Sequence, residues 1–219
     1  MENIEIINIW KSYDKKLDQS LVLNRIIAEE ITRKKIKSAL SSMSLVKFFA
    51  IAVGVAWVAL LDVIIVNLAI HALDKVSLFF LVSAGIQVLI TKVAIAIYIH
   101  QLVLIHQTDI SESIAETQER LARLKSSTLL VARILFLQLP VWTTFYWNKS
   151  MLQNGNAFLF ILQAVVTISL SYLAIWLFIN IKYENKDKKW FRLMFNGAEW
   201  VPIIKSMELL KEVEEFKKG

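Results

Sequence analysis

Three ionisable side chains stand inside long apolar stretches of the sequence: Asp62, Lys92 and Arg133. A charged group in the hydrocarbon of a membrane is costly, so such residues often mark proton relays, ion paths or ligand sites. Lys92 and Arg133 lie close to the ends of their stretches, where a long side chain can bring its charge to the lipid headgroups. We therefore expect structural roles for these two residues.

Asp62 is the candidate for chemistry, because it lies deep in the first apolar stretch and its side chain is short. At 1.5 Å per helical residue, Lys92 lies about 12 Å closer than Asp62 to the cytoplasmic side, so a direct ion pair is not expected. We predict a hydrogen-bonded structural aspartate, with a proton or cation site and a contact between subunits as alternatives. Its expected partners are Thr143, Thr144, Tyr146 and Lys75, and a transport path would add Asn67, Gln87 and Gln163.

No pattern in the sequence predicts catalysis or metal binding. The three histidines, His71, His100 and His106, have no metal-ligand spacing to one another or to carboxylates, and the chain has no cysteine. The sequence also lacks a glycine-rich phosphate loop, a nucleophile elbow and an HExxH motif. We therefore predict a protein without enzymatic activity, cofactor or metal.

Four apolar stretches are long enough to cross a bilayer core of about 30 Å as helices. They lie at roughly 48–70, 76–99, 128–147 and 157–180. The chain has only five glycines and two prolines, so helices should dominate. Pro140 should bend the third span, because proline has no backbone N–H to donate. The predicted fold is all-α: an integral membrane protein with four transmembrane helices in residues 48–180.

The polar segments that flank the spans carry apolar residues at helical spacing. In residues 1–47, an amphipathic helix is indicated by Ile6, Trp10, Tyr13 and Leu17. Ser20 is expected to cap a second helix in this segment. Residues 100–127 should form a helical hairpin between the second and third spans. Its seam consists of Ile110, Ile114, Thr117, Leu121 and Leu124.

The last segment, residues 181–219, should contain a helix in the membrane interface and a final amphipathic helix. The first has the apolar face Trp190, Phe191, Met194 and Phe195. The final helix should have Pro202 in its first turn and the seam Ile203, Met207, Leu210 and Val213. We expect the N-terminal, middle and C-terminal helices to gather into a cytoplasmic helical bundle. We expect the core of this bundle to contain Trp10, Tyr13, Leu17, Met207, Leu210 and Val213. The alternative is that these residues form a docking face for a protein partner.

Basic residues are distributed unevenly around the spans. Of 25 lysines and arginines, 21 lie in residues 1–47, 106–127 and 182–219, and two, Lys75 and Lys149, lie in the remaining loops. Cytoplasmic loops carry the excess of basic residues, so both termini and the middle loop should be cytoplasmic. The basic clusters at 33–37 and 182–192 suit anionic lipid. No fold or motif predicts a nucleic-acid partner.

Three stretches carry a resemblance to known proteins: IWKSYDKKLDQSLVLN near the start, and KKWFRLMFNGAEW and MELLKEVEEFKKG near the end. With them the chain resembles an uncharacterised family of four-span membrane proteins from Bacteroidota, which share a charged amphipathic start and an acidic–basic final helix. Some members are encoded beside extracytoplasmic-function sigma factors. The resemblance implies a protein of the bacterial inner (plasma) membrane and favours a regulator of a sigma factor. It assigns no functional residue.

The leading hypothesis is a membrane-anchored, non-enzymatic interaction or regulatory protein. Its cytoplasmic bundle would bind a protein partner such as a sigma factor, in the manner of an anti-sigma factor, and its spans would contact membrane lipids. The alternative is a small transporter or ion channel, built as a homo-oligomer, with Asp62 in the pathway.

Overall fold

The computed structural model describes residues 2–71, 76–107, 114–148, 151, 156–197 and 199–218. The regular secondary structure in these ranges is entirely helical. Four helical segments are long and apolar enough to cross a membrane. They are α1 (Glu2–His71), α2 (Leu78–His106), α3 (Ile114–Phe136) continued by α4 (Leu139–Thr144), and α6 (Ala157–Asn180). The short η1 (Tyr183–Asn185), α7 (Lys189–Phe195) and α8 (Val201–Lys218) follow. The predicted all-α fold, with four helices of membrane-spanning length, is confirmed.

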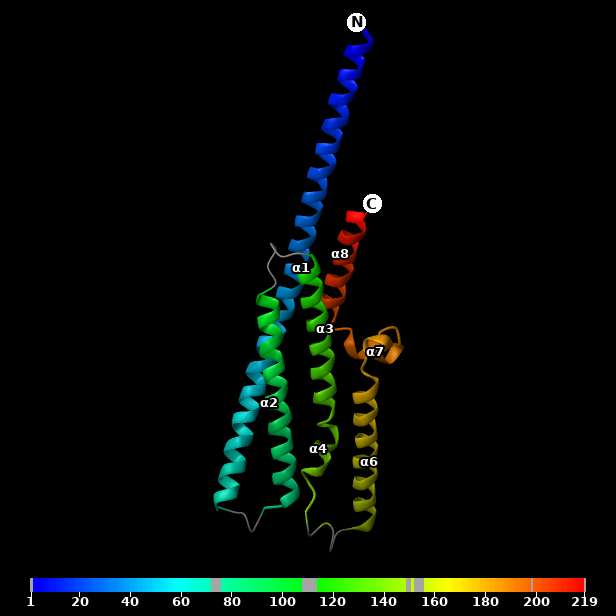
Figure 1. Ribbon diagram of the computed structural model, residues 1–219. Helices are drawn as coiled ribbons and strands as arrows, with labels where there is room; N and C mark the ends of the chain where they lie inside the picture. Colours follow the sequence, from blue (N-terminus) through cyan, green and yellow to red (C-terminus); the bar gives the residue numbers. More distant parts are fainter. Residues whose placement is uncertain are drawn as a thin grey trace.

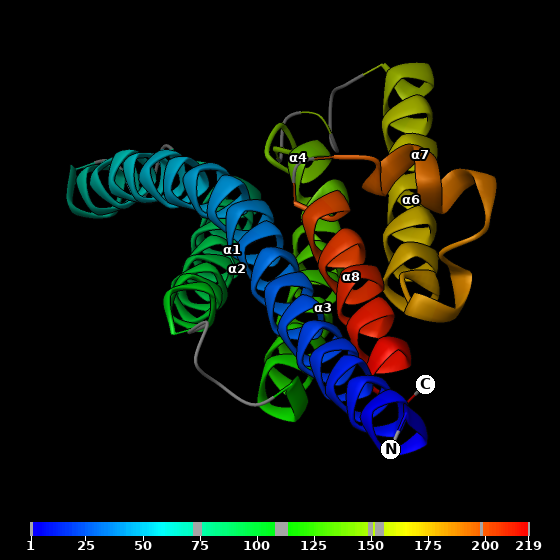
Figure 2. The ribbon, with the colours of Figure 1, turned by 90° about the horizontal axis from the view of Figure 1, so that it is seen from above.

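The four spans form an open row (Figure 1). α1 packs on α2, α2 packs on α3 and α4, and α3 and α4 pack on α6. In both views α1 and α6 stand on opposite sides of this row (Figures 1 and 2). α8 packs on α1 and α3, and the two chain termini lie toward the same end of the molecule, here called the terminal end (Figure 1).

Helix α1 runs without a break from Glu2 to His71 and is 70 residues long. At 1.5 Å per residue its length is about 105 Å, more than three times the thickness of a bilayer core. The prediction that Ser20 caps a second helix is therefore wrong. No glycine or proline occurs in residues 1–47, so nothing interrupts the helical hydrogen bonds there. The polar segment and the first span are one helix.

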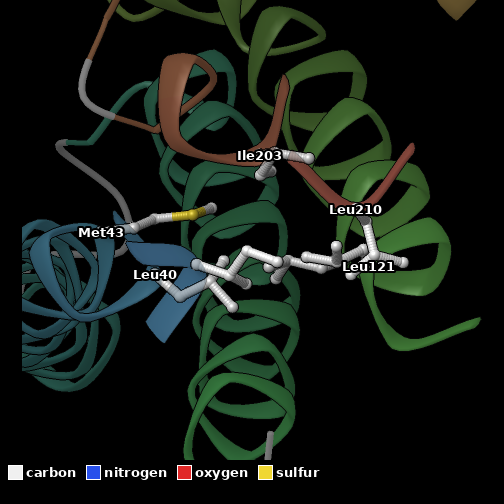
Figure 3. Close-up of a cluster of buried hydrophobic side chains, with 7 residues drawn as sticks. Leu40, Met43, Leu121, Ile203 and Leu210 are labelled. Carbon is white, nitrogen blue, oxygen red and sulfur yellow. The ribbon is translucent and has the colours of Figure 1, made fainter. Parts of the chain in front are cut away.

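A cluster of buried apolar side chains, here called the bundle core, joins α1, α3 and α8 (Figure 3). It consists of Ile36, Leu40, Met43, Leu121, Leu124, Ile203 and Leu210. The three residues of α1 are spaced four and three apart, which puts them on one face of the helix. The same spacing of three between Leu121 and Leu124 turns both toward α8.

The seams predicted for the middle and last helices are confirmed where the structure describes them. Thr117, Leu121 and Leu124 are buried, and Met207 packs against the bundle core beside the buried Leu210. For three other members of the predicted seams, either the residue or its side chain is outside the described part of the chain. They are Ile110, Ile114 and Val213. Helical periodicity therefore located these two packing faces correctly.

The third span is interrupted before Pro140, as predicted. α3 ends at Phe136 and α4 begins at Leu139. Between them, the N–H groups of Leu137 and Gln138 donate to carbonyls three residues earlier, at 3.1 Å each. This tighter pattern is typical of a helix end, and the proline that follows cannot restore the regular ladder.

Helix α7 has the predicted apolar face, but much of this face packs on protein. Phe191 is 1% exposed and belongs to a second cluster with Leu177 of α6 and Trp200. The ring of Phe191 stacks on Phe195 with 4.4 Å between centroids. Met194 is 39% exposed, so part of the face is not covered by protein. α7 thus fastens the end of α6 to the start of α8.

Helices α1 and α2 approach each other closely at Gly54. A Cβ atom added there would lie 3.2 Å from Cγ1 of Ile95, and small residues allow such approaches between membrane helices. We expect Gly54→Leu to lower the free energy of unfolding by about 2 kcal/mol, because overpacking forces the helices apart. Gly54→Ala should cost less, because the Ile95 side chain can turn away. Denaturant titration in micelles measures both, and a Gly54→Leu variant as stable as the parent would contradict the close approach.

Candidate functional site

Asp62 of α1 pairs directly with Lys92 of α2, with 3.0 Å between Oδ2 and Nζ. The prediction that their offset prevents a pair is wrong. Leu61 packs in one cluster with Val88 and the two helices run in opposite directions (Figure 1), so the level of Asp62 on α2 lies about five residues from Lys92, or about 7.5 Å. The lysine and aspartate side chains together span this distance. The ion pair also replaces the headgroup contact expected for Lys92.

The Asp62–Lys92 pair lies on the outer surface of the row of spans. The carboxylate side chain is 45% exposed and the lysine side chain is 54% exposed. Ionisable residues within spans almost always face a protein interior or a water-filled cavity. The exposed position of this pair is therefore unusual for ionisable residues within spans.

The other partners predicted for Asp62 have different neighbours. The hydroxyl of Thr143 lies 2.9 Å from a threonine hydroxyl of α6, and that of Thr144 lies 2.7 Å from a serine hydroxyl of α2. Tyr146 is 77% exposed, and Lys75 lies outside the described residues. The structure thus assigns Lys92 to Asp62 in place of the three candidates that it describes.

A row of polar side chains joins α2 to α3 and α4. Ser83 pairs with Thr144, and the amide of Gln138 donates to the hydroxyl of Thr91 at 3.2 Å. Gln87, between these two contacts, is fully buried, and its amide has no partner among the described residues. Hydrogen bonds of this kind hold membrane helices together.

The polar groups predicted for a transport path do not gather around Asp62. Asn67 is exposed on α1, and Gln87 is buried whereas Asp62 lies at the surface. Gln163 donates to the backbone carbonyl of Thr143 at 2.7 Å. Within the part of the chain that the structure describes, these groups do not form one site with Asp62.

A buried lysine, Lys47, lies directly before the predicted first span and is 0% exposed. Its ammonium group donates to the side-chain carbonyl of Gln101 and lies 4.9 Å from the ring centre of Tyr98. The Tyr98 hydroxyl in turn donates to the Glu199 carboxylate at 3.4 Å. Burial lowers the pKa of Lys47 to about 8, and the charge of Glu199 partly opposes this shift. We call Lys47, Gln101, Tyr98 and Glu199 the lysine centre.

A cavity of about 320 Å³ lies beside the lysine centre and is lined by Tyr98, Glu199 and mostly apolar residues. Thr128 also lines it, and the buried hydroxyl of Thr128 has no hydrogen-bond partner among the described residues. This centre could not be recognised in the sequence, because Lys47 stands where basic residues commonly flank a span.

Arg133 has the structural role expected of it, by a different contact. Its Nε donates to the backbone carbonyl of Ile181 at 2.5 Å. Ile181 caps the C-terminus of α6, where the helix dipole favours a positive charge. Arg133 thus ties α3 to the end of α6.

The three N-terminal residues predicted for the core or the docking face lie outside the core. Trp10, Tyr13 and Leu17 are 74%, 68% and 59% exposed. They belong to residues 10–35 of α1, here called the arm, in which no described side chain is buried. In Figure 1 this part of α1 extends past the other helices. A docking face is the alternative that stays a prediction for them.

The histidines show no common site in the described ranges. Nδ1 of His71 lies 3.1 Å from the carbonyl oxygen of Asn67 in the same helix. His100 and His106 are exposed on α2. Among the described residues, no three histidine, aspartate or glutamate side chains are close enough to share a metal ion.

The fold and its surfaces define an all-α protein with four helices of membrane-spanning length, a small bundle at the terminal end and an exposed helical arm. Comparison with protein-family models, curated proteins and solved structures gives no match for this chain. Function is therefore inferred from the geometry described above.

Proposed function

We propose that this protein is a non-enzymatic interaction protein that its four spans anchor in a bacterial inner membrane. The arm carries the proposal: it leaves the bundle as one helix and exposes Trp10, Tyr13 and Leu17 on one face. Exposed apolar surface of this kind is typical of an interaction site. An amphipathic helix with anchors at this spacing commonly binds a groove of a partner protein.

The arm and the bundle face the cytoplasm in this proposal. The excess of lysine and arginine in residues 1–47, 106–127 and 182–219 supports this orientation. The chain termini lie toward one end of the row of spans (Figure 1), which agrees with an even number of crossings. The partner is then a cytoplasmic protein, and the resemblance to proteins encoded beside sigma factors makes a sigma factor the first one to test.

The test is capture of a purified sigma factor by the full-length protein in detergent or nanodiscs. We expect Leu17→Glu to weaken capture at least about tenfold, because a charge replaces an apolar anchor. Lys15→Glu lies on another face of the arm and should have little effect. Equal capture by the parent and Leu17→Glu, or capture by neither the parent nor a variant, would contradict the proposal.

Transport is the alternative class, and Asp62 distinguishes the two. The outward-facing pair with Lys92 supports a role for Asp62 in helix association. Asp62→Asn should then leave partner capture intact, whereas a transporter with Asp62 in its path would lose flux.

A further inference from the structure

We infer that the arm pairs with the arm of a second copy, in a parallel two-stranded coiled coil. This inference rests on the proposed function and orientation, because it names what covers the apolar face of the arm. In the dimer, the seam residues Trp10, Tyr13 and Leu17 hold the two arms together. A cytoplasmic protein contacts apolar residues that the seam leaves exposed, such as Val22 and Ile26, which are 58% and 56% exposed. Leu17→Glu then weakens capture by separating the arms.

The first support is a heptad repeat along the arm. Its a positions are Trp10, Leu17, Asn24 and Ile31, and its d positions are Tyr13, Ser20, Ile27 and Lys34. The five apolar members are between 45% and 74% exposed. Apolar a and d positions over three to four heptads are typical of a coiled coil. In a monomer, all five of these apolar side chains would stay exposed to water.

The polar residues of the repeat favour two parallel strands. A single asparagine at an a position, here Asn24, selects a dimer with aligned strands, because its side chain pairs with its own counterpart. Glu30 falls at a g position and Lys35 at the e position five residues later. In a parallel dimer these positions face each other across the seam, so Glu30 of one copy attracts Lys35 of the second.

The membrane imposes the same geometry. Two copies with the same orientation in one bilayer can be related by a two-fold axis along the membrane normal, which makes their α1 helices parallel. Such an interface is self-complementary, so that each residue pair occurs twice. The common orientation of the two copies in the membrane therefore favours parallel over antiparallel pairing of the arms.

The protein's own helices leave this face of α1 uncovered below the arm. α1 packs on its neighbours through residues that recur at intervals of seven: Leu40, Lys47, Gly54 and Leu61. The a and d positions lie on another face, and Leu45 and Phe48 there are 76% and 68% exposed. These two residues line a groove of about 1110 Å³ between α1 and α2.

The outward-facing ion pair lies on this same surface. In the heptad repeat that begins at Trp10, Asp62 occupies a d position, and Lys92 lies beside it at 3.0 Å. Two such pairs that meet across a two-fold axis are complementary in charge, because Asp62 of each copy can also attract Lys92 of the other. A second copy thus supplies the cover that lipid tails cannot give to charged groups.

The chain has no cysteine, so single cysteines can test the seam in native membranes. We expect Ser20→Cys, at d, to form disulfide-linked dimers on mild oxidation at least about five times faster than Ser12→Cys, at c. Adding Ile27→Glu to Ser20→Cys should abolish the cross-link, whereas adding Lys15→Glu, at f, should not. Equal cross-linking of the two cysteines, or none from Ser20→Cys, would overturn the inference.

The same proteins separate this inference from the proposed function. Reduced Ser20→Cys is also tested for capture of the sigma factor. Capture without a Ser20→Cys cross-link overturns the dimer and leaves the proposed function standing. A cross-link without capture supports the dimer and contradicts the proposed partner.

Discussion

Replacement of Lys92 by methionine is expected to lower the free energy of unfolding in a bilayer by about 3 kcal/mol, the cost of an unpaired charge at the centre of a span. The lysine lies 3.0 Å from Asp62, whose short side chain lies well inside the first apolar stretch. Without it, the short carboxylate side chain cannot reach the headgroups. Steric trapping or denaturant titration in bicelles measures the loss.

Substitution of the other partner should cost much less. In Asp62→Asn the lysine is left alone, but its long side chain can turn toward the headgroups, so a loss below about 1 kcal/mol is expected. The double variant Asp62→Asn, Lys92→Met should regain most of the stability lost by Lys92→Met. Additive losses in this cycle would show that the two residues do not interact.

Raising the pH from 8 to 10.5 is expected to stabilise the protein through Lys47. The pKa of this buried ammonium group is lowered from 10.5 to about 8 in the folded chain. Between these values the unfolded chain binds more protons than the folded chain, so the free energy of unfolding rises with pH. Below pH 8 both states are protonated and the penalty for burying the charge is present in full. The total rise should reach about 3 kcal/mol.

A pair of variants isolates this contribution from other groups that titrate in the same range. Lys47→Met removes the buried charge, so its stability should rise less between pH 8 and 10.5. Lys37→Met changes an exposed lysine of the same helix and should follow the parent. Unfolding in micelles, measured at several pH values, gives the slopes, and identical slopes for all three proteins would refute the role of Lys47.

The spans and two packing faces could be predicted because each depends on local pattern. Residues 157–180 carry no charge, so their length and apolarity define a span without knowledge of its neighbours. The interruption before Pro140 follows from the missing N–H of proline. Leu121 and Leu124 are buried as their spacing predicts, since helical periodicity fixes a face whatever packs on it.

The Asp62–Lys92 pair could not be predicted, because it depends on how α1 and α2 are aligned. The packing of Leu61 on Val88 and the close approach of Gly54 to Ile95 set that alignment. A shift of two or three residues between the helices moves a side chain by about 3 to 5 Å. That is enough to separate two charged groups or to bring them together.

The lysine centre was missed for a related reason. Lys47, Gln101 and Glu199 come from segments that are distant in the sequence, and no spacing rule connects them. The exposure of Trp10 was missed because an amphipathic pattern shows which side of a helix is apolar but not what covers it. Whether Trp10 is buried or exposed depends on where along α1 the contacts with the other helices end.

The unbroken helix α1 makes the arm a rigid lever on the first span. From Lys47 to Trp10 the helix extends about 55 Å, so a change of about 10° in the tilt of the span displaces the arm tip by about 10 Å. Spans tilt in response to the thickness of the surrounding bilayer. A change in lipid composition that tilts the span is therefore expected to displace the arm tip, with no moving part other than the helix itself.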